Sequence, residues 1–568
     1  MLILGINNMH DASSALVCDG KVIAAAEEER FTRNKHMIGF PVNAIRYCLA
    51  EANITIRDID FVAVSWKPWM LKTRLFQAFK TLIYSPTAFK SKTSRGMGQM
   101  KNEWFELFTM KSLVERHFGK GKFKLKYVDH HLSHAASAFY VSPFDSAAVF
   151  TVDGAGEEET AVFWKGEGTR LIKLKAVKLP HSIGQFYAAI TAFLGFKVQS
   201  DEYKVMGLAS YGEPRFADYF RQNVLTVERD GGFRLNHMFI DYHLARQGVF
   251  LPVTTEVLGS PRRPEDEVTS NHADIASSAQ KVVESTIFHS LNYLYNQTGK
   301  TDRLCLAGGV ALNCVANGKI IENTEFRNLF IQPAAGDAGT ALGAALYLYH
   351  SYTGKPRDYI MKDAYFGPRY SNRQCEEAIK SFGLPYRELP EKRLCETVAK
   401  EISEGKLICW FQGRMEWGPR ALGNRSLLAD PRRKEIKDII NLKVKQREAF
   451  RPFAPSILEE KSGEYFPDKI PSPFMLFSFK VRPEKAGEIP AVVHVDGTAR
   501  PQTVSHEANP LYWNLIKEFE TITGVPILLN TSFNVQEPIV CTPEDAIKCF
   551  LKTKVDYLVL NNLLVTQN

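Results

Sequence analysis

The sequence predicts an α/β protein in which a duplicated strand unit forms the N-terminal part and a second α/β domain forms the remainder. In the first copy the apolar run LILGINN stops at small and polar residues and is followed by SALVC, Asp19-Gly20 and KVIAAA. Two apolar runs joined by Asp-Gly are a strong indication of a β-hairpin. The same order returns over residues 147–174 as strand AAVFTV, loop DGAGEEE, strand TAVFWK, turn GEG and strand RLIKLK. This repetition predicts a duplicated fold in which one polar loop from each half faces a shared cleft.

Two further segments follow the order strand, glycine-containing loop, helix. The run RLCLA leads into Gly308-Gly309 and VALNCVANGKI, and NLFIQP leads into AAGDAGTALGAALYLYH. Glycine lets the backbone approach a phosphate closely, and a helix N-terminus favours an anion. We therefore expect Gly308 and Gly309, together with Gly154 of the DGAGEEE loop, to line a nucleotide cleft. The loops match neither the dinucleotide fingerprint nor the Walker pattern.

The domain boundary is expected where the periodicity is lost, in the stretch KPRDYIMKDAYFGPRYS. We expect one domain over residues 1–360, with a helical insertion over about 66–125, and a second over 370–568. The second has its own strands (KLICWFQG, VPILLNTSF, DYLVLNN) and helices (QCEEAIKSFG, PEDAIKCFLKT).

Composition indicates a globular protein of a reducing compartment. The chain has 568 residues, 24% of them charged, and its nine cysteines form no C-x-x-C pair, so we expect free thiols and neither disulfides nor a structural zinc site. The N-terminus does not read as a signal peptide, no apolar run is long enough to span a membrane, and we expect a cytoplasmic protein. A net charge of +8 without a long basic run favours a mixed solvated surface, then small phosphorylated substrates, and nucleic acid last.

The clearest chemical cluster is DHHLSHAAS at residues 129–137. On a helix, His130 and His134 would lie on one face about 6 Å apart, which is the spacing that chelates one metal ion. Asp153, after the second-copy strand, and Asp337, in the AAGDAG loop, are the candidates for further ligands. Two imidazoles with carboxylates and open positions would suit Fe(II), Mn(II) or zinc.

A second candidate is His10, which stands beside Asp11 in the first-copy loop. An imidazole is readily poised as a base near neutral pH, and an adjacent carboxylate could orient it or raise its pKa. The alternative is an ordinary turn residue.

In the C-terminal part, basic residues are interleaved with glycine and proline. Arginine binds phosphate in a bidentate manner and lysine acts as a point charge, so these loops could form a pocket for a polyphosphate and a second small anion. Salt bridges between loops are the alternative. The segments are GRMEWGPRALGNRS, KVKQRE, RPFAP, HVDGTARPQ and NTSFN.

Over essentially its whole length the chain resembles the O-carbamoyltransferases of the nodulation-factor, cephamycin and tobramycin type. The N-terminal motifs that match are HDASSAL, EEERFTRNKH, DHHLSHAASAF, VDGAGE, EYKVMGLASYG, GGVALNCVANGK and GDAGTALGAA. The C-terminal ones are EWGPRALGNRS, KQREAFRPFAPS, HVDGTARPQTV and NTSFNVQEPIV.

The resemblance implies an N-terminal domain of the duplicated actin/hexokinase type (ASKHA, Kae-like), similar to the universal tRNA threonylcarbamoyl transferase, and a C-terminal YrdC-like twisted α/β domain. Carbamoyl phosphate and ATP would give carbamoyl-adenylate in the second domain, and the intermediate would pass internally to the first, where a substrate hydroxyl takes the carbamoyl group.

The resemblance also implies roles for individual residues. In the C-terminal pocket, with Mg(II) assisting, the anions would be neutralised by Arg420, Lys445, Arg447, Arg451 and Arg500, and the nucleotide would be positioned by Asn530 and Ser532. In the N-terminal domain a metal, with iron expected, would be held by His130, His134, Asp153 and Asp337. Gly308, Gly309 and Asn313 would line the adenosine pocket, and His10 would be the general base.

Other functions remain open at this stage. The chain could instead modify a tRNA base, or its first domain could act as a non-catalytic, ATP-driven clamp. The acceptor cannot be read from the sequence; an aminoglycoside, a macrolide, a β-lactam hydroxymethyl group, a sugar and a guanidinium alkaloid are all candidates. No nucleic-acid or membrane partner is expected, and a homodimer is possible.

Overall fold

The computed structural model describes the whole chain except residues 71–78, 80–82, 84–104, 237–238, 241–251, 469, 554 and 568. Its described residues form two compact units. The first comprises Met1–Glu28 and His36–Met361, and the second comprises Glu29–Lys35 and Lys362–Asn568. The sequence predicted one crossing between the domains near residues 360–370, but did not predict that the seven residues Glu29–Lys35 belong to the second unit.

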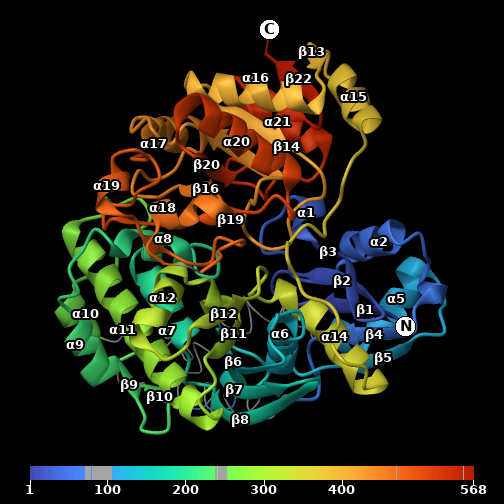
Figure 1. Cartoon of the computed structure of the whole chain (residues 1–568). Helices are drawn as coiled ribbons and strands as arrows, with labels where there is room; N and C mark the ends of the chain where they lie inside the picture. The colour runs from blue at the N-terminus through green and yellow to red at the C-terminus, as the bar shows by residue number, and fades with distance from the viewer. Residues whose placement is uncertain are drawn as a thin grey trace. The chain divides into compact units, whose positions relative to one another are not determined.

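The first unit contains the same five-stranded sheet twice (Figure 1). Its first sheet has the order β3-β2-β1-β4-β5 and its second the order β8-β7-β6-β11-β12, read from the corresponding edge. In each sheet the first three strands pair antiparallel, and the last two are added in parallel. This duplication is the actin/hexokinase-type fold that the sequence predicted. The strands are β1 (Leu2–Asn7), β2 (Ser13–Cys18), β3 (Lys21–Glu27), β4 (Phe61–Val64) and β5 (Lys124–Tyr127), then β6 (Ser146–Val152), β7 (Glu159–Glu167), β8 (Arg170–Lys178), β11 (Arg303–Ala307) and β12 (Asn328–Ile331).

Both predicted hairpins are confirmed. Asp19 and Gly20 have φ of +47° and +83° and join β2 to β3 in a two-residue turn, which requires left-handed backbone at both positions. The strands β1 and β6, which lead into the polar loops, are buried almost throughout, as expected for strands with helices packed on their sheet.

Two helices, α6 (His130–Phe139) and α14 (Ala338–Thr353), pack against each other inside the first unit. Helix α14 also packs on β1, β2 and β4, whereas α6 packs on β6 and β11 (Figure 1). Glycine permits the close approach: a Cβ on Gly5 would lie 1.9 Å from the carbonyl oxygen of Ala341, and one on Gly343 would lie 1.7 Å from that of Ser133. The packing places the end of β6 and the start of α14 beside the histidines of α6.

Much of the predicted helical insertion at 66–125 falls outside the described residues. Its described end forms the helix α5 (Met110–Phe118), and the chain then enters β5, which pairs in parallel with β4 and so belongs to the first sheet.

The second unit has an eight-stranded mixed sheet, as expected for a separate α/β domain. Its strand order is β13-β22-β21-β14-β15-β20-β16-β19. The strands are β13 (Tyr386–Glu388), β14 (Ile408–Phe411), β15 (Arg425–Ala429), β16 (Ala454–Leu458), β19 (Gln502–Val504), β20 (Ile527–Ser532), β21 (Tyr557–Leu560) and β22 (Leu563–Thr566), and the principal helices are α15 (Asn372–Ser381), α16 (Glu391–Ser403), α20 (Pro510–Thr523) and α21 (Pro543–Thr553).

The segment Glu29–Lys35, which contains α1 (Glu29–Thr32), is held by two arginines within the second unit. The buried Arg30 guanidinium donates to the Gly418 carbonyl at 2.9 Å. Arg33 donates to the carbonyls of Ile539 (2.7 Å) and Pro538 (2.5 Å). These contacts connect the segment to the EWGPRALGN and NTSFNVQEPIV loops.

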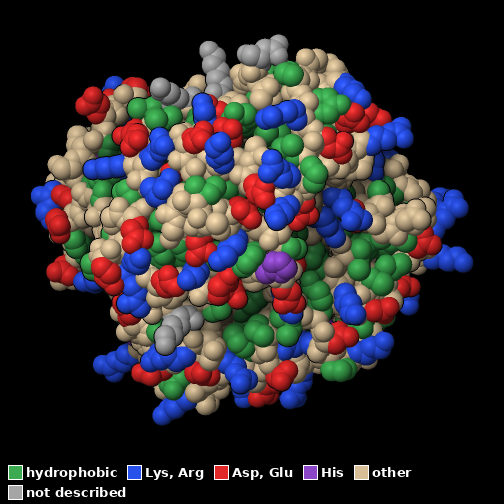
Figure 2. Space-filling model, turned by 45° about the horizontal axis from the view of Figure 1, so that its top comes forward, with side chains coloured by type: hydrophobic (Ala, Val, Ile, Leu, Met, Phe, Trp, Pro, Cys, Tyr) green, Lys and Arg blue, Asp and Glu red, His purple; other side chains and the backbone are tan. Residues whose placement is uncertain are grey.

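All nine cysteines are free thiols, as predicted, and all but Cys18 are buried. Within the part of the chain that the structure describes, no helix combines the length and the apolar character needed to cross a membrane. On the face shown in Figure 2, acidic and basic side chains are interspersed.

Candidate functional site

The histidine cluster sits on the first turns of α6, whose N-terminus is fixed by two carboxylates. Asp129 is the N-cap and accepts a hydrogen bond from the Leu132 N–H at 3.1 Å. The buried Glu157 accepts from the His130 N–H at 3.1 and 3.2 Å. Negative charge at a helix N-terminus is favourable, so this pair stabilises the turn that carries the histidines. The sequence analysis missed Glu157, although it lies in the DGAGEEE loop.

The four predicted metal ligands converge. Both imidazoles of His130 and His134 are fully buried, and their Nε2 atoms lie 3.1 Å apart. An oxygen of Asp153 lies 3.2 Å from His130 Nε2 and 3.7 Å from His134 Nε2. An oxygen of Asp337, at the N-cap of α14, lies 3.6 and 3.7 Å from the same two atoms.

This donor set fits a divalent metal ion. Each of the four residues offers a ligand atom, and these atoms all lie within 4.8 Å of one another. Two imidazole nitrogens facing each other in a buried space cannot both be satisfied as acceptors without a proton or a cation between them. Two nitrogens and two carboxylate oxygens suit Fe(II), Mn(II) or Zn(II).

The electrostatics of the cluster reflect the same convergence. Burial alone would lower the pKa of His134, but hydrogen bonds and charges from Asp153 and Asp337 raise it to about 9. Burial would raise the pKa of Asp153, but the two histidines hold it well below its usual range. In the absence of a metal the cluster therefore binds a proton, in the position where an ion would supply positive charge.

The third histidine of the motif, His131, has a different role. Its Nδ1 lies 2.9 Å from the Thr151 hydroxyl and its Nε2 lies 3.0 Å from the Glu159 carbonyl oxygen. Burial, with the neighbouring His130 and His134, lowers its pKa well below the usual range. His131 is a neutral core residue that ties α6 to β6 and β7.

His10 lies in the loop after β1, half-buried, with its Nδ1 3.2 Å from an Asp11 oxygen. Burial opposes protonation, but Asp11, with smaller contributions from Asp337 and Asp153, raises the pKa of His10 to about 9. The loop that precedes Asp337 lies close to Asp11, since a Cβ placed on Gly336 would lie 3.9 Å from an Asp11 carboxylate oxygen. His10 therefore lies within the electrostatic field of the Asp337 and Asp153 carboxylates.

The glycine loops are built more tightly than the sequence analysis expected. Gly308 has φ of +98°, and a Cβ there would lie 2.1 Å from the Val152 carbonyl oxygen. The Gly309 N–H donates to Asp153 at 3.0 Å, so in this structure it orients a predicted metal ligand rather than pointing into open space. Around Gly154 a Cβ would meet nothing within 4 Å, and its carbonyl accepts from the Ser182 hydroxyl at 2.8 Å.

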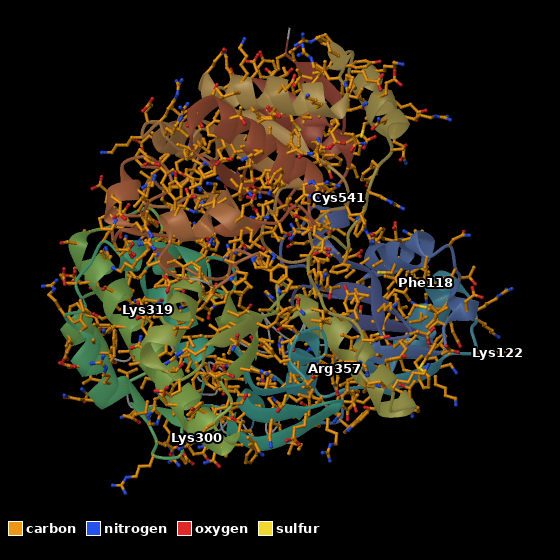
Figure 3. All side chains as sticks on the ribbon, viewed as in Figure 1. Phe118, Lys122, Lys300, Lys319, Arg357 and Cys541 are labelled. Atoms are coloured by element: carbon orange, nitrogen blue, oxygen red, sulfur yellow. The ribbon has the colours of Figure 1, made fainter. Side chains whose placement is uncertain are left out.

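Asn313 belongs to a buried polar network. Its amide exchanges hydrogen bonds of 3.0 and 3.1 Å with Gln280, and its oxygen caps α12 (Cys314–Gly318). Gln280 in turn donates to Glu284 at 2.9 Å, and both lie on the long helix α11 (Ser270–Gln297). Lys319 (labelled in Figure 3) donates to both Glu284 oxygens at 2.9 Å. These partners of Asn313 could not be identified from local sequence.

In the second unit, Lys445 is the centre of a cationic cluster. The residue is 1% exposed, and its Nζ donates to the Asn534 carbonyl (2.7 Å), to the Asn534 side chain (2.9 Å), and to the carbonyl and hydroxyl of Ser532. Burial, then the charges of Arg447 and Arg451, hold the pKa of Lys445 well below its usual range. Three cationic side chains are therefore close together in a partly buried place.

Asparagines hold this cluster in position. Asn441 accepts from Arg447 Nε at 2.7 Å and donates to the Arg451 carbonyl at 3.2 Å. Asn534 also accepts from the Ser532 hydroxyl at 2.7 Å. Asn534 belongs to the NTSFN segment named in the sequence, although no individual role was predicted for it, and Asn441 lies outside the segments that were named.

The remaining predicted residues lie on neighbouring strands and loops. Asn530 on β20 donates to Ser456 at 3.0 Å and to Gln502 at 3.2 Å. Gln502 on β19 donates to the Leu422 carbonyl at 2.8 Å, which joins the loop of Arg420 to the strand that follows Arg500. Arg500 is half-buried and forms no hydrogen bond or ion pair with the residues that the structure describes.

Both halves of the chain match the models of one enzyme family. Residues 2–346 match the model described as Carbamoyltransferase N-terminus, and residues 399–567 match Carbamoyltransferase C-terminus. The chain belongs to the carbamoyltransferase family, and the protein is a carbamoyltransferase.

Relatives extend over the full chain. An uncharacterised protein of Synechocystis sp. is 43% identical, with 100% of this chain and 96% of the relative covered. The nodulation protein NolNO of Sinorhizobium fredii is 40% identical, with 98% and 79% covered. Among solved structures, component A of the (R)-2-hydroxyglutaryl-CoA dehydratase of Acidaminococcus fermentans is 15% identical with a TM-score of 0.34, covering 62% of this chain and 98% of that chain. The fold assignment rests on the duplicated strand order, not on this likeness.

Proposed function

We propose that the protein is an O-carbamoyltransferase that forms carbamoyl-adenylate from carbamoyl phosphate and ATP in the second unit. The carbamoyl group is then transferred to a hydroxyl of a small molecule at the histidine cluster of the first unit. Family membership supports carbamoyl transfer, and relatives that are nodulation proteins support a small-molecule acceptor.

The observation that carries the proposal is the buried Lys445, which is held by Ser532 and Asn534 and lies within reach of the charges of Arg447 and Arg451. Because burial and two nearby guanidinium groups disfavour the charged form of Lys445, a bound anion of high charge would restore its ammonium form and would itself be bound favourably. Lys445, Arg447 and Arg451 together match the charge of carbamoyl phosphate and the phosphates of ATP. The half-buried Arg500 and Arg420 supply further bidentate contacts to phosphate oxygens.

The first steps take place at this cluster. Water attacks carbamoyl phosphate, and the C–O bond to phosphate breaks, which gives carbamate and inorganic phosphate. A carbamate oxygen then attacks the α-phosphorus of ATP, and pyrophosphate leaves with the electron pair of the broken P–O bond. The cationic side chains stabilise the charge on both leaving groups, and Ser532 and Asn530 position the nucleotide. A Mg²⁺ ion would supply further neutralisation of the nucleotide phosphates.

Transfer takes place at the first unit. The acceptor hydroxyl oxygen bonds to the carbamoyl carbon, its proton passes to His10, and AMP leaves with the electron pair of the broken C–O bond. Gly154, Gly308 and Gly309, with Asn313, shape the adenosine side of the site. His130, His134, Asp153 and Asp337 would hold a divalent metal, which supplies Lewis-acid stabilisation of the adenylate phosphate.

The test of adenylate formation needs no acceptor. The full-length protein is incubated with ATP, carbamoyl phosphate and Mg²⁺, and pyrophosphate and phosphate are measured. We expect slow release of both, dependent on each substrate, because the adenylate accumulates when no hydroxyl consumes it. Arg500→Ala should abolish the release, whereas Arg387→Ala, which removes an exposed arginine of β13, should not.

Transfer is tested with a panel of hydroxyl compounds. Aminoglycosides, macrolides, sugars and a hydroxymethyl cephem are supplied in turn, and carbamoylated products are sought by mass spectrometry. A product that requires both ATP and carbamoyl phosphate identifies the acceptor class. Pyrophosphate release that does not depend on carbamoyl phosphate would contradict the proposed reaction.

A further inference from the structure

A second histidine, His36, meets His10 at the same carboxylate. His36 Nδ1 lies 2.8 Å from one oxygen of Asp11, and His10 Nδ1 lies 3.2 Å from the other. The two imidazole rings stack, with centroids 5.2 Å apart and an angle of 23° between the planes. Asp11 therefore bridges two parallel imidazoles through their Nδ1 atoms. His36 is the last residue of the EEERFTRNKH motif, and the proposed carbamoyl transfer assigns no role to any residue of that motif.

The backbone fixes this arrangement from both sides. The Ala12 N–H donates to the Met37 carbonyl, and the Gly39 N–H donates to the Asn8 carbonyl, each at 2.9 Å. The Asn7 side chain donates to the His10 carbonyl at 2.8 Å. The loop after β1 and the loop that carries His36 are thus held together on both sides of the Asp11 carboxylate.

Both Asp11 and His36 adopt left-handed backbone, with φ of +53° and +54°. Residues other than glycine rarely adopt this conformation, and it persists where surrounding structure enforces it, often at functional sites. Here the left-handed backbone directs the Asp11 and His36 side chains toward each other. The backbone conformation of the two loops, and not only the side-chain rotamers, therefore fixes the pairing.

We propose that His36 is a positioning residue of the transfer site, which acts through Asp11 to fix the ring orientation and the tautomer of His10. This inference rests on the proposed role of His10 as the base. A carboxylate accepts at both oxygens, so each imidazole donates its Nδ1–H to Asp11. The neutral His10 is thereby left with Nε2 as its basic nitrogen, the atom available to a hydroxyl.

His36 also moderates the charge that His10 experiences. The groups that act on His10 are Asp11, Asp337 and Asp153, all of which favour its protonated form. A protonated His10 cannot take a proton from the acceptor. The hydrogen bond from His36 neutralises part of the Asp11 charge. The pKa of His10, about 9 with His36 in place, is therefore lower than it would be without His36, and the neutral base forms at a lower pH.

The test follows the titration and tautomer of His10 in the full-length protein by long-range ¹H–¹⁵N NMR on ¹⁵N-labelled histidine, with Zn²⁺ and after chelation. His10→Gln identifies the resonance. We expect His36→Ala to raise the titration midpoint of His10 by roughly one pH unit, because Asp11 loses a hydrogen-bond donor. His36→Gln, whose amide can donate to the same oxygen, should restore the midpoint to within a few tenths. His117→Ala, an exposed histidine of α5, is the matched control and should leave it unchanged.

A structural role alone would not give this pattern. If His36→Ala leaves the midpoint and the tautomer of His10 unchanged, or if His36→Gln shifts them as far as alanine does, the inference is overturned. In an Asp11→Asn background, His36→Ala should have no further effect. Pyrophosphate release from ATP and carbamoyl phosphate is measured in parallel. Its absence from the wild-type protein would contradict the proposed function, whereas failure of the titration pattern alone contradicts only the role of His36.

Discussion

His134 couples metal binding to pH in a predictable direction. In the metal-free cluster its pKa is raised to about 9 by Asp153 and Asp337, so at neutral pH it holds a proton that a metal ion must displace. We predict that the apparent affinity for Zn²⁺ rises about tenfold per pH unit from neutrality to about pH 9 and levels off above it. Titration calorimetry in buffers of different ionisation enthalpy measures the proton released.

His134→Ala should remove both the tight site and the proton release. An affinity that does not change over this pH range would show that the proton is not held by the ligand set. The same variant should still form pyrophosphate from ATP and carbamoyl phosphate, because the second unit is unchanged.

Replacement of His10 should also separate the two half-reactions, with transfer impaired and adenylate formation retained. His10→Gln keeps a polar side chain of similar reach but cannot accept the acceptor proton at neutral pH. We predict a loss of about 10²–10⁴-fold in transfer to the acceptor identified in the panel, the usual contribution of one acid–base group. Pyrophosphate release should stay within about twofold of wild type. Equal losses in both assays would indicate a general folding defect.

The histidine motif shows which site residues can be predicted from residue type and spacing and which cannot. The i, i+4 spacing correctly brought His130 and His134 to one face of α6, and polar loop positions named Asp153 and Asp337 as their partners. The neighbouring His131 could not be separated from them by spacing, because its partners Thr151 and Glu159 come from strands that follow it in the chain. Residues that hold the ligands, such as Glu157, were missed for the same reason.

At the scale of elements, the position of α6 depends on how closely α14 approaches it. Gly343→Ala would place a Cβ 1.7 Å from the Ser133 carbonyl oxygen, between the two histidines in the α6 sequence. Because that contact is with backbone, the helices must move apart. We predict a loss of about 1–3 kcal/mol or more in the stability of the first unit, together with reduced metal content. Thermal unfolding and elemental analysis measure the two effects.

Gly463→Ala is the matched control for this substitution. A Cβ at Gly463, on the short helix α18 (Ser462–Tyr465), would meet nothing within 4 Å. It should leave stability and metal content close to wild type. Unchanged metal content in Gly343→Ala would show that the ligand geometry tolerates movement of α6.

The elements themselves were largely accessible from the sequence, because the signals are local. Apolar runs joined by Asp19-Gly20 gave the first hairpin, and the repeat over 147–174 gave the second and the duplication. The predicted helical insertion ended at about residue 125 and so included the first two residues, Lys124 and Leu125, of the strand β5. Its role as an edge strand comes from parallel pairing with β4, which no local pattern records.

At the scale of the whole molecule, the least predictable feature is that Glu29–Lys35 belongs to the second unit while its flanking residues belong to the first. The contacts that secure the segment join residues about five hundred positions apart, such as Arg33 and Ile539. Periodicity and turn signals extend over a few residues and cannot reveal such pairing. The first residue after the segment is His36, so the loop that positions Asp11 and the segment that completes the second unit are continuous in the chain.

This continuity makes the anchoring of the segment testable in the intact protein. Arg33→Ala removes charge-assisted hydrogen bonds to the carbonyls of Pro538 and Ile539 and leaves both acceptors without that donor. We predict a loss of about 1–3 kcal/mol in the unfolding free energy of the second unit, seen as a lower transition temperature in calorimetry. Arg46→Ala, which removes an exposed arginine of α2 (Val42–Glu51) in the first unit, should have little effect on that transition. If Arg33→Ala and Arg46→Ala lower the transition temperature equally, the anchoring of Glu29–Lys35 by Arg33 does not stabilise the second unit.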